Sequence, residues 1–239
     1  MKIKHSIDLN NVEALTQCLS RQKVLRERFS LEIPERDACN ALYAALKVEV
    51  ESRGRFFQLT QETRTTLQDA TRWLINPQGT PWLMLMGLVG NGKTSLAKAI
   101  GNLIQFLSER EYGPTHCKKV RFIKAKTVCQ LCGERDGNKE AREDYGSLFT
   151  EELLIIDDLG EEPNEVMVFG NVYTPIKDLL SERYDSRRFT IITTNLNADQ
   201  LFERYGPRIY DRMKEVYTSI IFENESYRAP KANNPLEYQ

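Results

Sequence analysis

Residues 82–95 constrain the fold of this chain more strongly than any other segment. An uninterrupted apolar run, residues 82–86 (WLMLM), is followed at once by residues 87–94 (GLVGNGKT), and an amphipathic stretch, SLAKAIGNLIQFL, begins at Ser95. A continuous apolar run is typical of a strand buried on both faces of a parallel sheet. Closely spaced glycines let a backbone turn tightly, so that its N–H groups converge on one anion, and the positive N-terminus of a following helix points to the same place. The segment therefore predicts an α/β fold with a phosphate-binding turn.

The turn also matches the pattern G-x-x-x-x-G-K-[ST], which indicates a nucleotide site. Lys93 is expected to contact the β- and γ-phosphates, and the hydroxyl of Thr94 is expected to bind Mg²⁺. A glycine-rich turn without a ligand is the alternative, which the flanking strand and helix disfavour. The predicted ligands are ATP or ADP with Mg²⁺. The residues expected to line the site are Gly87, Leu88, Val89, Gly90, Asn91, Gly92, Lys93, Thr94 and Ser95.

Four more short apolar runs follow, each separated from the next by a segment long enough for a helix. They are residues 120–123 (VRFI), 153–156 (LLII), 189–192 (FTII) and 219–222 (SIIF). Strands that alternate with helices predict βαβ units, in which helices cover both faces of a parallel sheet. The expected architecture is a three-layer α/β/α domain around a five-stranded sheet.

Two of these runs end in polar residues suited to chemistry on a bound nucleotide. Asp157 and Asp158 follow the run at residues 153–156, and Asn195 lies just after the run at residues 189–192. Because ligands bind at the carboxyl ends of parallel strands, Asp157 is predicted to hold Mg²⁺ together with Thr94. Asp158 is predicted to activate the attacking water, and Asn195 to contact both that water and the γ-phosphate. Polar strand ends without a catalytic role are the alternative.

A pair of arginines lies downstream, in the segment RYGPRIYDRMKE. Arg208 and Arg212 are four residues apart, which places both side chains on one face of a helix. An arginine offered to the γ-phosphate of a neighbouring subunit would stabilise the charge that develops during hydrolysis. The alternative is a solvated helix with ion pairs to Asp211 and Glu215.

The overall composition excludes several classes of protein. The 239 residues carry 33 basic and 34 acidic side chains, so any nucleic-acid contact depends on a local patch rather than on bulk charge. The polar start and the lack of a long apolar stretch predict no signal peptide, no membrane span and a cytoplasmic location. Five scattered cysteines suit a reducing compartment.

Cys129 and Cys132 form a C-x-x-C, which is predicted to lie on a half-buried helix face, with zinc binding as the alternative.

The first 54 residues are expected to form a helical module, with helices over residues 8–29 and from Pro34 to Gly54. A third helix is expected over residues 60–75. Residues 229–239 are polar and predict a tail.

In order and spacing, the segments GLVGNGKTS, LLIIDDLG, IITTNL, YGPRIYDRM and IIFENESYR resemble the DnaC/IstB branch of AAA+ ATPases. The resemblance covers roughly residues 55–228, which would then be the AAA+ ATPase domain, and it implies the sheet order 5-1-4-3-2. It also implies an ATPase that assembles as a homo-oligomer, with Arg208 and Arg212 acting in trans. Asp158 is one methylene shorter than the glutamate usual at this place, so slow turnover that depends on a partner or on DNA is expected. The lid is expected to be absent or truncated, and Arg228 lies where a lid arginine would be.

The resemblance further implies a replicative helicase as partner, with residues 1–54 as the partner-binding module. A transposition ATPase of the IstB kind is the first alternative, and a non-hydrolysing ATP-dependent adaptor is the second. A small-molecule kinase is a third, which Asn195 and the paired arginines disfavour. In initiator-type relatives, the region equivalent to residues 124–152 carries an extra helix that meets single-stranded DNA. The basic residues in or near this region, which could contact single-stranded DNA, are Lys118, Lys119, Arg121, Lys124 and Lys126. The alternative to DNA contact is a solvated, charged crossover.

Overall fold

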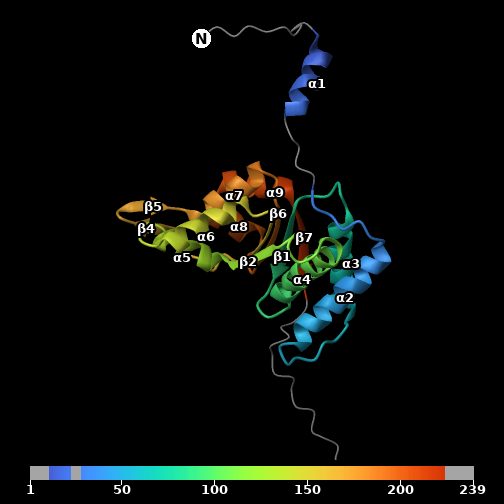
Figure 1. Ribbon diagram of the computed structural model, residues 1–239. Coiled ribbons are helices and arrows are strands. Elements are labelled where there is room, and N and C mark those ends of the chain that lie inside the picture. Colours follow the sequence, from blue (N-terminus) through green and yellow to red (C-terminus); the bar gives the residue numbers. More distant parts are fainter. Residues whose placement is uncertain (1–10, 23–27, 224–239) are drawn as a thin grey trace, which may run out of the picture.

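A five-stranded parallel sheet forms the centre of the protein (Figure 1). The computed structural model describes residues 11–22 and 28–223. The strands of this sheet are β1 (Trp82–Gly87), β2 (Val120–Lys124), β3 (Leu153–Leu159), β6 (Phe189–Thr194) and β7 (Tyr217–Phe222). Their spatial order is β2-β3-β6-β1-β7, and every neighbouring pair is parallel. When only these five strands are numbered along the chain, the order reads 5-1-4-3-2 from the β7 edge, as the resemblance implied.

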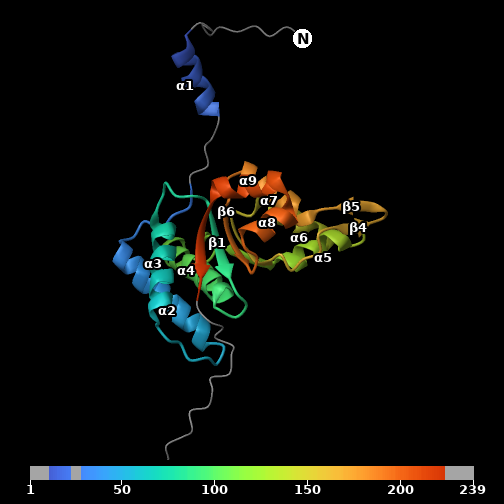
Figure 2. The same cartoon turned by 180° about the vertical axis from the view of Figure 1, so that it is seen from behind.

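Helices cover both faces of the sheet and complete the three predicted layers (Figures 1 and 2). On one face lie α2 (Glu35–Glu51), α3 (Gln61–Ile75) and α4 (Lys93–Tyr112). On the other lie α5 (Ala125–Glu134), α6 (Lys139–Thr150), α7 (Pro175–Asp185), α8 (Ala198–Tyr205) and α9 (Pro207–Val216).

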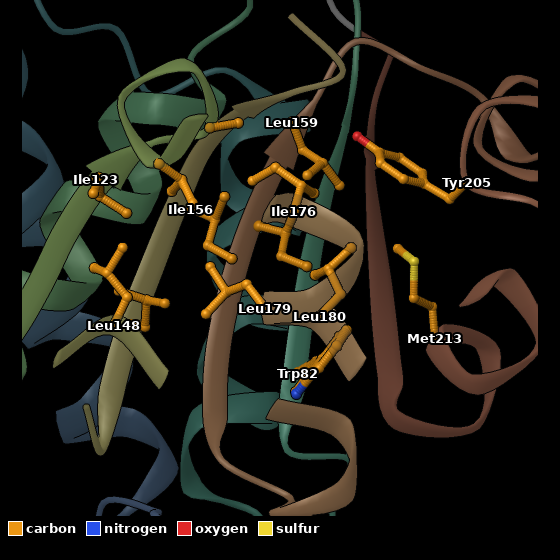
Figure 3. Packing of buried hydrophobic residues seen from close by; sticks show 14 of the residues in the cluster. Trp82, Ile123, Leu148, Ile156, Leu159, Ile176, Leu179, Leu180, Tyr205 and Met213 are labelled. Carbon is orange, nitrogen blue, oxygen red and sulfur yellow. The ribbon is translucent and has the colours of Figure 1, made fainter. Parts of the chain in front are cut away.

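Each face of the sheet has its own apolar cluster. Along β1, Met84 packs into the cluster beneath α5–α9, whereas Leu83 and Leu85 pack into the cluster beneath α2–α4. Figure 3 shows the first cluster, where Leu179 and Leu180 of α7 face the sheet. Because successive residues of a strand point to opposite faces and both faces are buried, the strand sequences are apolar throughout.

The packing does not divide at residue 54. Leu42 and Leu46 of α2 are buried in the same cluster as Leu74 of α3 and Ile100 of α4, so α2 is part of the α/β body. Just before α2, the guanidinium of Arg28 donates to the carbonyl oxygen of Thr80 at 2.8 Å, which holds the chain to the start of β1. By contrast, α1 (Val12–Gln22) stands apart from this body in both views (Figures 1 and 2).

An antiparallel hairpin, β4 (Val166–Val168) with β5 (Asn171–Tyr173), was not predicted. It projects beyond α5 and α6 at the end of the molecule farthest from α2 (Figures 1 and 2). Phe169 and Gly170 form its turn, and both have positive φ, as a two-residue turn that matches strand twist requires. The two strands are too short for an alternating pattern to reveal them, and phenylalanine is not a residue that indicates such a turn.

The region between β2 and β3 contains two helices, α5 and α6. Cys129 and Cys132 lie on α5 and are both buried, as the prediction of a half-buried helix face required. Within residues 11–22 and 28–223, no group of histidine, cysteine and acidic side chains is arranged to hold a metal ion. Arg228, any lid and the predicted tail at 229–239 lie outside the described residues.

Candidate nucleotide-binding site

The glycine turn joins the end of β1 to the start of α4. Gly87, Gly90 and Gly92 all have positive φ, at 142°, 86° and 100°, a conformation that residues with a side chain rarely adopt. A Cβ atom on Gly87 would also lie 2.5 Å from the carbonyl oxygen of Phe222. The same oxygen accepts a hydrogen bond from Nδ2 of Asn91 at 3.1 Å. The end of β7 therefore holds the turn in place from the neighbouring strand.

The ammonium group of Lys93 lies inside the turn. This residue is 6% exposed, and its Nζ donates to the carbonyl oxygens of Gly87 at 2.8 Å and Leu88 at 2.7 Å, and to Oδ1 of Asn91 at 3.1 Å. A buried ammonium group needs such partners, because an unpaired charge is costly to remove from water. An anion bound at the turn would meet both this positive charge and the N-terminus of α4.

Thr94 and Asp157 are brought together from α4 and β3. Oγ1 of Thr94 donates to Oδ1 of Asp157 at 2.8 Å, and Asp157 is 2% exposed. The same carboxylate oxygen accepts from Oγ1 of Thr193 on β6 at 2.7 Å. Hydroxyl and carboxylate oxygens are the ligands that Mg²⁺ prefers, so this pair fits the predicted cation. Thr193 was missed by the sequence analysis, since a threonine inside an apolar strand is most often read as a residue with high β-propensity.

Asp158 has an unusual backbone conformation. Its φ is +56°, and the pairing between β3 and β6 shifts register between Ile156 and Leu159, which is the signature of a bulge that redirects a side chain. The backbone N–H of Asp158 donates to Oγ1 of Thr193 at 2.9 Å. Burial, and then the neighbouring carboxylate of Asp157, raise the pKa of Asp158 above its ordinary value.

Asn195 completes the group at the carboxyl edge of the sheet. It directly follows Thr194, the last residue of β6, which pairs with Met86 of β1 and Leu159 of β3. Its position is therefore between the glycine turn and the two aspartates, and it is partly exposed. The structure thus gathers all the predicted residues of the turn, both aspartates and Asn195 at one edge of the sheet.

The two arginines lie on α9 and differ from each other. Arg212 of α9 forms an ion pair with Asp185 at 3.7 Å, and its guanidinium lies 5.1 Å from the centre of the Tyr184 ring. Both partners are at the end of α7, just before β6 begins, so Arg212 lies near the amino edge of the sheet, away from the turn of its own chain. Arg208 is exposed, and its side chain makes no hydrogen bond or ion pair with the rest of the described residues.

The five basic residues around β2 do not form one patch. Lys118 and Lys119 precede β2, whereas Lys124 and Lys126 lie at its carboxyl end. Lys118 pairs with Glu152 at 2.6 Å, and Arg121 donates to both carboxylate oxygens of Asp144 at 2.7 and 2.8 Å. Only Lys124 and Lys126 are exposed on the same edge of the sheet as the glycine turn.

Comparison with known proteins decides the family. The family model described as IstB-like ATP binding protein matches residues 50–234. The chain belongs to this family. Among solved structures, the IstB-like protein is similar to the DnaC helicase loader, at 21% identity and a TM-score of 0.53 over 70% of this chain and 94% of that one. It is similar to DnaI at 18% identity and a TM-score of 0.54, over 80% of this chain and 95% of that one.

AMPPCP-bound DnaA from Aquifex aeolicus shares the fold at 19% identity and a TM-score of 0.50, over 73% of this chain and 50% of that one. These structures share the fold of the IstB-like protein, and the family that it belongs to is one of ATP-binding proteins. No helix within its described residues is long and apolar enough to cross a membrane.

Proposed function

We propose that this IstB-like protein hydrolyses ATP between neighbouring subunits and uses the cycle to load a replicative helicase onto DNA. The observation that carries the proposal is the arrangement of its charges. An enclosed lysine and two aspartates lie at the carboxyl edge of the sheet, whereas Arg212, on the helix that also carries Arg208, lies near the opposite edge. A protomer with this arrangement holds Arg212 away from its own nucleotide site and leaves Arg208 exposed, which favours hydrolysis at an interface between copies.

Within one protomer, the glycine turn and Lys93 would bind the β- and γ-phosphates. The oxygens of Thr94 and Asp157 would hold Mg²⁺, which when bound offsets the negative charge of the phosphates. Asp158 would orient and deprotonate the attacking water, and Asn195 would hold that water beside the γ-phosphate. The short side chain of Asp158 has less reach than a glutamate, which supports slow turnover that rises with a partner or with DNA.

The next subunit would supply an arginine. Arg208 is the stronger candidate, because it is exposed and has no ion-pair partner within the described chain, whereas Arg212 already contacts Asp185 and Tyr184. ATP would favour assembly, since contacts to its γ-phosphate span the interface, and hydrolysis would release them. Turnover per subunit should therefore rise with protein concentration in a phosphate-release assay. Equal turnover per subunit at all concentrations would contradict the interface, and assembly without phosphate release would favour a non-hydrolysing adaptor.

The helicase is proposed as partner because DnaC is described as a helicase loader. We assign the partner contact to the residues before α2, including α1, since α2 is packed into the body. The experiment compares the full chain with a version that lacks residues 1–27 for capture of two purified candidates, a replicative helicase and an IS21-type transposase. Capture of the helicase by the full chain alone supports the proposal, and capture of the transposase alone would favour the transposition reading.

The raised pKa of Asp158 predicts the pH dependence of turnover. A carboxyl group whose pKa lies above the ordinary value of 3.8 takes up its proton at a higher pH during acidification, and only the ionised form can accept a proton from water. As the pH is lowered at saturating ATP, turnover should therefore begin to fall at a higher pH than it would with an aspartate of ordinary pKa. A profile that stays flat down to about pH 4 would exclude Asp158 as the base.

Single-stranded DNA is proposed to bind weakly and without sequence preference near Lys124 and Lys126, the exposed lysines beside the nucleotide edge. We expect Lys126→Glu to weaken binding of an oligothymidine by roughly threefold or more at low salt, since a phosphate contact becomes repulsive. Lys118→Glu makes the same charge change at the opposite edge, where Lys118 is paired with Glu152, and should have little effect. Fluorescence anisotropy with ATP present measures both, and equal losses would place the DNA elsewhere.

A further inference from the structure

Glu162 is a buried carboxylate to which the proposed mechanism gives no role. It lies in the loop after β3, four residues beyond Asp158, and its side chain is 1% exposed. Charged side chains are rarely buried in this way unless they are paired, and pairing a buried charge often gains no more stability than an apolar residue of the same size. Its presence therefore calls for a role other than stability.

The carboxylate of Glu162 contacts two separate parts of the chain. Oε2 accepts a hydrogen bond from the backbone N–H of Gly160 at 2.7 Å. Oε1 accepts from the hydroxyl of Tyr205 at 2.6 Å and from Nε of Arg204 at 3.4 Å. The main-chain oxygen of Glu162 also accepts from the guanidinium of Arg204. In Figure 3 the hydroxyl of Tyr205 points toward the end of β3, near Leu159.

These contacts connect the two functional regions of the protomer. On one side, Gly160 lies two residues after Asp158, and a Cβ atom on Gly160 would be 2.6 Å from Cδ1 of Leu196, the residue that follows Asn195. On the other side, Arg204 and Tyr205 end α8, and Gly206 leads directly into α9, which carries Arg208.

The hydrogen bonds at Glu162 have a fixed direction. Burial, and then the nearby carboxylate of Glu162, raise the pKa of Tyr205, so its phenol remains a donor. Hydrogen bonds to an ionised acceptor are stronger and shorter than neutral ones. The loop after β3 is therefore held to one oxygen of this carboxylate and the end of α8 to the other.

We propose that Glu162 is a positioning residue that makes the loop after β3 and the α8–α9 segment move as one unit. A change at the aspartates of one subunit then shifts the arginine that this subunit offers to the next, so that neighbouring nucleotide sites are coupled. The inference rests on the proposed function, because it requires Arg208 to act in trans.

Glu162→Gln in the full chain tests the proposal, since it removes the charge and keeps the shape. Glu165→Gln is the matched control, because it makes the same change at an exposed position of the same loop. We expect Glu162→Gln to lower turnover roughly tenfold with the KM for ATP changed less than about twofold, while Glu165→Gln behaves like the wild type. Tyr205→Phe removes one donor to the same carboxylate and should lower turnover in the same direction; it decides the question if Glu162→Gln does not fold.

The double variant Glu162→Gln with Arg208→Ala separates positioning from a local structural effect. If Glu162 acts through the arginine helix, the double variant is no slower than Arg208→Ala alone, whereas independent roles give losses that multiply. Multiplying losses, or wild-type turnover in Glu162→Gln, would overturn the inference. If the wild type itself releases no phosphate, the hydrolysis proposal fails. ATP-dependent assembly, followed by sedimentation, then decides: weaker assembly of Glu162→Gln than of Glu165→Gln supports the role of Glu162, and equal assembly refutes it.

Discussion

Replacing Lys93 with alanine should abolish ATP binding at micromolar concentrations, with a loss of affinity of at least about 100-fold. The reason is that Lys93 carries the buried positive charge of the turn and is directed by three oxygen atoms at 2.7 to 3.1 Å. Charge-assisted hydrogen bonds contribute about 1.5–3 kcal/mol each, and Lys93 is expected to make more than one to the phosphates. Titration with a fluorescent ATP analogue measures the effect.

Lys98→Ala is the matched control, because it removes the same charge from the same helix five residues farther along. Lys98 lies 4.5 Å from the centre of the Phe122 ring and away from the turn, so its loss should leave ATP affinity unchanged. If Lys93→Ala kept its affinity within about threefold, a difference below about 0.7 kcal/mol, the glycine turn would not be the phosphate site of this protein.

Arg208→Ala should leave ATP binding intact and lower turnover by about 100-fold or more, which is a modest estimate for an arginine that stabilises the transition state from a neighbouring subunit. The arginine is exposed, so its removal should not disturb the fold. Arg212→Ala should act differently. It removes an ion pair and a ring contact with α7, and a loss of stability of about 1 kcal/mol is expected for such a partly exposed pair.

A mixture of two inactive variants tests whether the arginine acts in trans. Lys93→Ala subunits do not bind ATP but still offer Arg208, whereas Arg208→Ala subunits bind ATP but offer no arginine. Mixed in equal amounts, they form some interfaces in which both parts are intact, so turnover should reappear. A mixture as inactive as either variant alone would mean that Arg208 does not act between subunits.

Much of the fold could be predicted because local pattern and tertiary burial agree. Each of the five apolar runs is a strand of the sheet, since continuous apolar sequence is what burial on both faces requires. The hairpin β4–β5 could not be predicted, because its strands have three residues each. The position of α2 could not be predicted either, because Leu42 and Leu46 indicate a helix with an apolar face but not which surface covers that face.

The candidate site likewise has a part that could be predicted from the sequence and a part that could not. The glycine turn has a fixed spacing of residues, and Asp157 lies at the end of an apolar run. Both features can be seen in the sequence. Thr193 and Glu162 contact partners 36 and 43 residues away, Asp157 and Tyr205, and no local pattern marks them. The difference between Arg208 and Arg212 likewise depends on the side chains of α7, which are remote in sequence.

The shared oxygen of Asp157 has a consequence for the energy of the proposed ATPase cycle. Thr94 and Thr193 both donate to it, but they come from different elements, the helix after the glycine turn and the central strand β6. If Thr94 turns its hydroxyl toward a bound cation, Thr193 still keeps the carboxylate oriented. The site is thus preorganised, and little reorganisation energy is needed each time nucleotide enters or leaves.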